Sequence, residues 1–204
     1  MNILIAGSAP LRGASSRRPL ASRHGPQGLA LARISSAHFD SQDVVQFVTF
    51  RLADSLPREA TLRLRHAAQP ESLRDEILDK GWGACWLRND RVARLVEQAF
   101  LIFDAERYRL HAWTIMPNHV HVLLSVTPGH PLGAIVSSWK RFTAREANVV
   151  LGRMGEFWQV DYWDRFIRNE EHFSAAESYI DLNPVKAGLV AEAHLWPWGS
   201  ARLR

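Results

Sequence analysis

The sequence predicts an α+β fold in which helices pack mainly on one face of an antiparallel sheet. Two observations lead to this fold class. Short runs of β-branched and aromatic residues alternate with segments of helical periodicity, and two of those runs are separated by a two-residue turn signal. At 204 residues, of which 47% are hydrophobic, the chain is long enough to form one domain around its own core.

The first strand is predicted over residues 44–52, a run of β-branched and aromatic residues. Residues 71–103 then mix apolar and charged residues at helical spacing on both sides of Gly81-Trp82-Gly83. We therefore expect a broken helix or two helices before the second strand.

The next two strands are predicted over residues 109–116 and 119–126, with Pro117-Asn118 between them. Two strand-like runs separated by two turn-forming residues predict an antiparallel hairpin. In such a hairpin, Thr114 and Met116 lie across from the start of the second strand.

The second half of the chain supplies a helix, a strand and a helix. The first helix is expected over residues 131–149 and the strand over residues 157–167, whose aromatic residues suit a sheet surface. A capping box at Ser174-Ala-Ala-Glu177 predicts the start of the last helix. It should end near Asn183, because Pro184 disfavours a helical residue before it. This order of elements predicts a sheet of ferredoxin-like type.

The basic charge is unevenly distributed. Residues 1–39 contain five arginines and no acidic residue, whereas the rest of the chain has 20 basic against 21 acidic residues. We predict a disordered basic arm over residues 1–38 and one folded domain over residues 39–204. Because the domain is nearly neutral, any nucleic-acid surface must come from local clusters of cations.

The cellular location is predicted from features that the sequence lacks. The single cysteine, Cys85, excludes an intrachain disulfide and a multi-cysteine zinc site. No apolar stretch approaches the length of a membrane span, and no charged segment precedes the short apolar run at the N-terminus. We therefore expect a soluble, cytoplasmic protein with no membrane partner.

His119 and His121 are the first candidates for chemistry. Because side chains alternate along a strand, both imidazoles project to one face while the aliphatic residues between and after them point into the core. The two rings could share a metal ion, with a third ligand from elsewhere in the chain. The alternative is an ordinary pair of strand histidines, because His-x-His alone is a weak signal.

Tyr179 and Asn183 are four residues apart in the last predicted helix, which places the phenol and the amide on one face. A phenol with the usual pKa of about 10 is a poor nucleophile unless a cation or a base lies beside it. A metal ion on the two histidines would supply that charge, and Asn183 could complete its ligand set. The alternative is that Tyr179 packs in the core and Asn183 caps the turn at Pro184.

Several blocks of the sequence resemble the REP-associated tyrosine transposases, which are single-tyrosine HUH transposase-like proteins. The blocks occur in consistent order between residues 44 and 200, and the histidine and tyrosine blocks together are quite specific. They are Met116-Pro-Asn-His-Val-His-Val-Leu-Leu124, Phe157-Trp-Gln159, Trp163-Asp-Arg-Phe-Ile-Arg168, Tyr179-Ile-Asp-Leu-Asn-Pro-Val-Lys-Ala-Gly-Leu-Val190 and Trp196-Pro-Trp-Gly-Ser200.

The resemblance implies a metal-dependent single-stranded DNA endonuclease and strand transferase with a ferredoxin-like domain. In that family the tyrosine attacks a DNA phosphate, leaving a 5′-phosphotyrosine link and a free 3′-hydroxyl. Tyr179 matches the nucleophile, and His119 and His121 match the metal ligands. Asn183 falls where a third, helix-borne ligand is expected. The implied ion is Mg or Mn, although nitrogen-rich ligation also admits zinc.

Family substrates are single strands with hairpins formed from repetitive extragenic palindromes, so hairpin DNA is the implied partner. Residues 140–168 contain six cations against four acidic residues, which favours contacts to the DNA backbone. Trp158, Tyr162 and Trp163 could stack on unpaired bases or pack in the core. The residues predicted to contact DNA are Arg51, Lys140, Arg141, Arg145, Arg165 and Arg168. A monomer is expected, with a dimer as the alternative.

Three rival interpretations stay open on the sequence. Tyr162 is an alternative nucleophile because it lies near an arginine-rich segment. A domesticated protein could keep the fold and bind hairpin DNA without cutting it. A metal hydrolase or cupin-like protein also uses His-x-His, but the carboxylate expected downstream in the cupin pattern is replaced here by Ser125-Val-Thr-Pro128.

Overall fold

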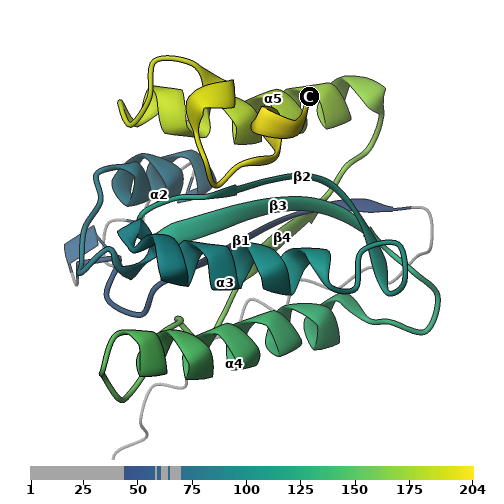
Figure 1. Ribbon diagram of the computed structural model, residues 1–204. Helices are drawn as coiled ribbons and strands as arrows, with labels where there is room; N and C mark the ends of the chain where they lie inside the picture. The colour runs from purple at the N-terminus through teal and green to yellow at the C-terminus, as the bar shows by residue number, and fades with distance from the viewer. Residues whose placement is uncertain (1–43, 58, 61–63, 65–69) are drawn as a thin grey trace, which may run out of the picture. The chain divides into compact units, whose positions relative to one another are not determined.

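The computed structural model describes residues 44–57, 59–60, 64 and 70–204. The predicted arm, residues 1–38, lies outside the described residues. Four strands form one antiparallel sheet in the order β2-β3-β1-β4 (Figure 1). Helices connect β1 to β2 and β3 to β4, which is the connectivity of a ferredoxin-like sheet. The predicted α+β class is therefore confirmed.

The strands are β1 (Val45–Arg51), β2 (Tyr108–Ile115), β3 (His119–Val126) and β4 (Trp163–Phe166). The first three coincide with predicted strands to within one residue at either end. The fourth is shorter than the predicted strand over residues 157–167. Trp158 forms only an isolated bridge to Leu52, and its side chain packs in the core.

The register of the sheet places the candidate histidines at its centre. β2 and β3 form the expected hairpin, in which Thr114 pairs with His121. The Met116 amide donates a hydrogen bond to the His119 carbonyl at 2.9 Å. On the other side of β3, Thr49 of β1 also pairs with His121. Both histidines are thus held between neighbouring strands.

One face of the sheet is covered by α3 (Asp90–Leu101) and α4 (Leu132–Val150). The even-numbered residues of β3 point to this face and form the main hydrophobic core with both helices. α3 begins after Asn89, whose side chain accepts hydrogen bonds from two amides of the first turn. None of the described helices is both long and apolar enough to cross a membrane.

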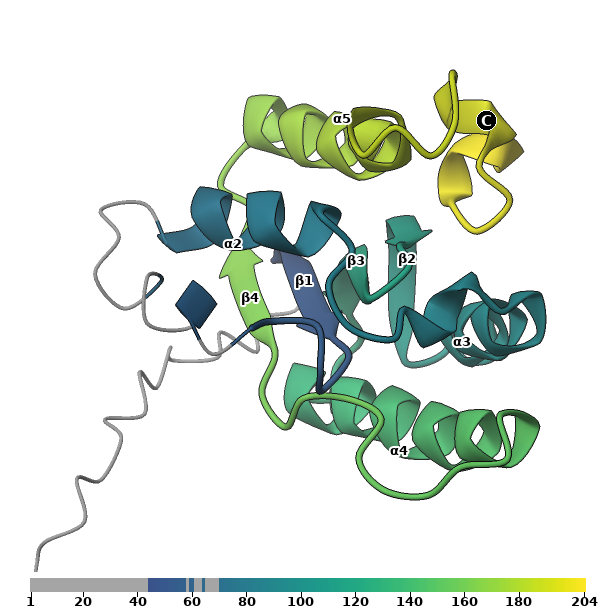
Figure 2. The same cartoon turned by 90° about the vertical axis from the view of Figure 1, so that its left-hand side faces the viewer.

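The opposite face is covered by α2 (Pro70–Asp79) and α5 (Glu170–Lys186) (Figure 2). The helices are thus divided between the two faces, which corrects the prediction that they pack mainly on one. The physical cause is that this face also carries apolar side chains. Phe47 and Leu123 form a second, smaller core with α5, and that core must be shielded from water.

α5 begins earlier and ends later than predicted. Asn169 caps the helix, because its side chain accepts a hydrogen bond from the His172 amide at 2.8 Å. The capping box at Ser174 therefore lies inside the helix. Pro184 also lies inside it, in the last turn. The continuous helix keeps the candidate tyrosine and asparagine on one rigid element.

Candidate active site

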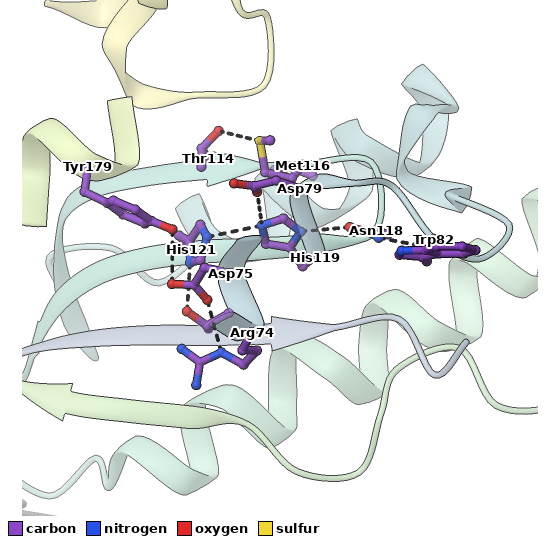
Figure 3. Close-up of polar contacts among 12 residues, drawn as sticks. Arg74, Asp75, Asp79, Trp82, Thr114, Met116, Asn118, His119, His121 and Tyr179 are labelled. Atoms are coloured by element: carbon purple, nitrogen blue, oxygen red, sulfur yellow. Dashed lines mark hydrogen bonds and ion pairs between the residues drawn. The ribbon is translucent and has the colours of Figure 1, made fainter. Parts of the chain in front are cut away.

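His119 and His121 lie side by side on the face of β3 that is covered by α2 and α5 (Figure 3). Both side chains are fully buried, and their Nε2 atoms are 3.1 Å apart. Imidazole nitrogens bind metal ions at about 2.1 Å, so one ion could contact both atoms. The two imidazoles converge as the alternation of the strand predicts.

Hydrogen bonds fix the orientation of both rings. Thr49 Oγ1 lies 2.7 Å from Nδ1 of His121, and Asn118 Oδ1 lies 2.8 Å from Nδ1 of His119. The Asn118 amide nitrogen donates to the Trp82 carbonyl at 3.0 Å, which directs the amide oxygen toward His119. Because an amide oxygen only accepts, Nδ1 of His119 carries the proton and Nε2 keeps its lone pair.

Both imidazoles are held in the neutral form. Burial lowers the pKa of His119 well below 6.5, and the neighbouring His121 lowers it further. Burial lowers the pKa of His121 to about 3, and the guanidinium groups of Arg74 and Arg165 add to this shift. Neutral imidazole is the form that binds a metal ion.

Tyr179 of α5 reaches the same cluster. Its ring centroid is 5.4 Å from that of His121, and its hydroxyl donates a hydrogen bond to Asp75 Oδ2 at 3.1 Å (Figure 3). Burial raises the pKa of Tyr179 above its ordinary value, and the carboxylates of Asp75 and Asp79 raise it further. The phenol therefore stays protonated until positive charge is added beside it.

Asn183 lies one helical turn after Tyr179 and is fully buried. Neither side-chain atom of Asn183 makes a hydrogen bond of ordinary geometry, although the amide is close enough to lower the pKa of Asp79. Buried polar atoms are ordinarily paired, so an unpaired amide here is a candidate ligand. Among the described residues, no group of three or more His, Cys, Asp or Glu side chains is arranged to hold a metal ion, so an amide would have to complete the set.

α2 contributes two carboxylates that the sequence reasoning missed. Asp75 accepts the hydrogen bond from Tyr179, and Asp79 Oδ1 lies 3.7 Å from Nε2 of His119. Burial raises the pKa of Asp79 to about 6, and repulsion from Asp75 adds to the shift. A signal was present, because the two acids are four residues apart and share a helical face, as Tyr179 and Asn183 do.

A small hollow adjoins the cluster and is lined by Phe47, Thr49, Arg74, Asp75, Trp163, Asp164 and Arg165. Arg74 is buried, forms an ion pair with Asp75 at 3.1 Å and stacks 4.4 Å from the centroid of the Trp163 ring. Arg165 is exposed and lies 4.7 Å from the centroid of the Phe47 ring. Arg165, predicted to contact DNA, is thus close enough to lower the pKa of His121.

Arg51 and Lys140 are engaged within the protein. Arg51 is buried and donates hydrogen bonds to the Leu52 carbonyl and the Ser55 hydroxyl, each at 3.2 Å. Burial lowers the pKa of Arg51 to about 10. The Lys140 ammonium donates to carbonyl oxygens of residues 159–161, and burial lowers its pKa to about 8. That either residue contacts DNA stays a prediction.

Arg141, Arg145 and Arg168 are exposed. The first two lie on α4, across the sheet from the imidazoles, where Arg145 pairs with Glu146 at 2.7 Å. Arg168 follows β4, and its guanidinium lies 5.3 Å from the centroid of the Phe166 ring. The residues predicted to contact DNA are therefore divided between the two sides of the sheet.

Tyr162, the alternative nucleophile, does not lie beside the imidazoles. It packs against the main hydrophobic core on the side of α3 and α4, with its hydroxyl near Gly133 at the start of α4. Of the two candidate tyrosines, Tyr179 is the one that meets the histidines.

Comparison with known proteins agrees with this arrangement. The family model described as transposase IS200 like matches residues 86–183, a stretch that contains both histidines and Tyr179 and ends at Asn183. The REP-associated tyrosine transposase of Escherichia coli (strain K12) is 26% identical to the chain over 121 residues. The aligned part covers 56% of this chain and 71% of that protein.

The fold has a counterpart among solved structures. A REP-associated tyrosine transposase bound to a REP hairpin aligns with a TM-score of 0.55 and 18% identity, covering 81% of each chain. At this identity the likeness concerns the fold, while the family-model match spans the histidine strand and most of the tyrosine helix. The chain is therefore similar to the IS200-like transposases and to a REP-associated tyrosine transposase in sequence, and it shares its fold with a REP-associated tyrosine transposase.

Proposed function

We propose that this protein is a transposase-like, metal-dependent single-stranded DNA endonuclease and strand transferase that acts on hairpin DNA through a covalent tyrosine intermediate. The main support is that Tyr179 lies against His121, whose imidazole in turn meets that of His119. The tyrosine and the histidines come from elements far apart in the sequence. A convergence of titratable groups with shifted pKa values is typical of an active site.

Tyr179 Oη is the proposed nucleophile. Its attack forms a bond to the DNA phosphorus and breaks the bond from phosphorus to the 3′ oxygen, which takes a proton from water. The phenol proton moves along the existing hydrogen bond to Asp75 Oδ2. The 5′ phosphate is then held on the tyrosine, and attack by a 3′-hydroxyl on this link rejoins a strand.

The proposed metal ligands are Nε2 of His119, Nε2 of His121 and Oδ1 of Asn183. These residues fit a metal ion, because both imidazoles are neutral and oriented through Nδ1, and the Asn183 amide makes no hydrogen bond of ordinary geometry. A bound divalent ion supplies positive charge that polarises the phosphate oxygen and opposes the carboxylates beside the phenol. We propose Mg or Mn, with zinc as the alternative.

Hairpin-containing single strands are the proposed substrate. Two observations support this choice: the transposase solved with a REP hairpin shares the fold, and the exposed Arg165 lies against Phe47, whose ring contacts His121. A phosphate approaching Tyr179 would meet that guanidinium. One chain supplies every proposed catalytic group, which supports a monomer as the active unit.

The test uses the full chain, Mg or Mn ions and labelled single strands that contain hairpins. We expect an adduct that survives denaturation with the wild-type protein and none with Tyr179→Phe. Tyr162→Phe is the matched control, because it removes a hydroxyl on the other side of the sheet and should leave the adduct unchanged. Chelation of the metal should abolish the adduct.

A hairpin-binding protein that does not cut is the second candidate. The raised pKa of Tyr179 favours it, because a protonated phenol beside two carboxylates is a poor nucleophile. Tight binding of hairpin DNA with no adduct under any divalent ion would establish this candidate and reject cleavage.

A further inference from the structure

We infer that Trp82 stacks on an unpaired base of the bound DNA strand, near the phosphate that is attacked. This inference rests on the proposed function, because its ligand is a nucleobase of the same single strand. It adds a contact to the base, whereas the proposed catalytic groups act on the phosphate. Trp82 lies before residues 86–183, which the family model matches, so the inference depends on the geometry of this chain.

Trp82 is the one tryptophan of this protein that is exposed to solvent. All eight tryptophans lie within the described residues, and the other seven are buried or half-buried. The exposed fraction of Trp82 is 51%. A single exposed apolar residue is ordinary on a protein surface, so the placement of this indole has to decide its role.

The backbone on both sides of Trp82 is held in a fixed conformation. Gly81 and Gly83 have φ angles of 69° and 87°, in the left-handed region that favours glycine. A Cβ at Gly83 would lie 2.7 Å from the carbonyl oxygen of Asp54, and the Ala84 amide donates to Asp54 Oδ2 at 2.8 Å. The indole is therefore presented from an anchored loop, so that binding a base orders little additional chain.

A continuous series of contacts joins Trp82 to the proposed nucleophile (Figure 3). The Asn118 amide nitrogen donates to the Trp82 carbonyl at 3.0 Å, and the Asn118 amide oxygen lies 2.8 Å from Nδ1 of His119. The His119 ring meets that of His121, against which Tyr179 lies. A strand whose phosphate meets Tyr179, and which then passes over the imidazoles toward Asn118, brings its next unpaired bases to the indole.

The chemistry of the indole suits an unpaired base of any sequence. Every base has a flat π-face on which an aromatic side chain can stack. The aromatic residues that the sequence suggested for this role are less accessible, because Trp158 is buried in the main core and Tyr162 packs against it. The Trp163 ring is covered by the Arg74 guanidinium, which lies 4.4 Å from the ring centroid. Trp82 is therefore the better placed of these aromatic side chains.

The test measures the affinity of the full chain for hairpin DNA with unpaired flanks, in which one flanking base at a time is removed to leave an abasic site. Every protein carries Tyr179→Phe, so that the strand is bound but not cut, and this variant is the parent. Adding Trp82→Leu should weaken affinity for the intact strand about fivefold or more, whereas Trp82→Phe keeps a π-face and should retain most of the affinity.

The abasic strands identify the stacking partner. Removal of one particular base should weaken binding by the parent and have no further effect on Trp82→Leu, because both changes remove the same contact. Phe142→Leu is the matched control, because Phe142 is an exposed aromatic residue of α4, across the sheet from the imidazoles. Its affinity should equal that of the parent for every strand.

The outcomes separate failure of the stacking contact from failure of the proposed function. If the parent binds no hairpin-containing strand, the proposed function falls and the stacking contact falls with it. If the parent binds and Trp82→Leu binds as tightly as Phe142→Leu does, the inference about Trp82 is rejected while the proposed function stands. A loss in Trp82→Leu that is the same for every abasic strand also rejects it, because such a loss does not depend on a base.

Discussion

The two faces of the sheet are built from alternate residues of the same strands, yet they bury different chemistry. On the face under α3 and α4, Val120, Val122 and Leu124 are fully buried in an apolar core. Polar atoms at that core have partners, as when Trp139 Nε1 donates to the Tyr108 hydroxyl at 3.0 Å. This face is complete without a ligand.

The face under α2 and α5 is equally buried at its centre but is polar there. His119 and His121 have no exposed area, and the neighbouring Asp79 and Asn183 keep buried side-chain atoms that make no hydrogen bond of ordinary geometry. Burying such atoms costs free energy, so this face destabilises the metal-free protein relative to an apolar one. The difference shows that alternate residues of β3 have different roles. One set forms the hydrophobic core, and the other set forms the candidate site.

The largest expected effect is on stability, from the apolar face. Leu124→Ala should lower the free energy of unfolding by about 2–5 kcal/mol, because it leaves a cavity in the main core. Urea denaturation measures the loss. Adduct formation per folded molecule should stay at the wild-type level, and a loss of adduct in fully folded Leu124→Ala would show that the two faces are not separate in function.

The next effect is on metal affinity, from the polar face. Thr49→Val should weaken Mn²⁺ affinity about 10- to 100-fold, because Nδ1 of His121 loses the hydroxyl that orients the ring. Calorimetry measures this change. Thr143→Val is the control on the other side of the sheet, where the hydroxyl accepts from Trp158, and its Mn²⁺ affinity should equal that of the wild-type protein. Equal losses of Mn²⁺ affinity in both variants would contradict a functional difference between the two faces of the sheet.

The smallest effect concerns DNA. Arg165→Gln, at the residue that lies against Phe47 on the histidine face, should weaken the binding of single-stranded DNA and reduce by about one the slope of log affinity against log salt. Arg145→Gln, on α4, should change the affinity for DNA by less than about twofold, because salt screens an exposed charge that lies far from the bound DNA strand. Binding measured across a salt series separates the two. Comparable effects would show that DNA contacts both sides of the sheet.

The strands could be predicted because their patterns are local. The runs 109–116 and 119–126 alternate around a two-residue turn, and their register then places Thr114 across from His121, as the structure has it. The ends of α5 were missed for a physical reason: Asn169 and Ser174 are both good helix caps, and local sequence does not rank them. Pro184 was expected to end the helix, yet the last turn can accommodate a proline.

The candidate site was predictable where spacing alone brings side chains together. His119 and His121 are two residues apart on a strand, and Tyr179 and Asn183 are four residues apart on a helix. Each spacing places the two side chains on one face of the element. The same helical spacing joins Asp75 to Asp79, but only the packing of α2 against the sheet shows that these acids face the histidines. A contact between distant elements leaves no periodic signal in the sequence.

The turn between β2 and β3 has a mechanical consequence. Asn118 holds the His119 ring through its amide oxygen and the Trp82 backbone through its amide nitrogen. Rotation of that imidazole would break the first bond, so the ring is set before any substrate arrives and needs little rearrangement during the reaction. The hairpin turn thus both reverses the chain and fixes the orientation of a proposed metal ligand.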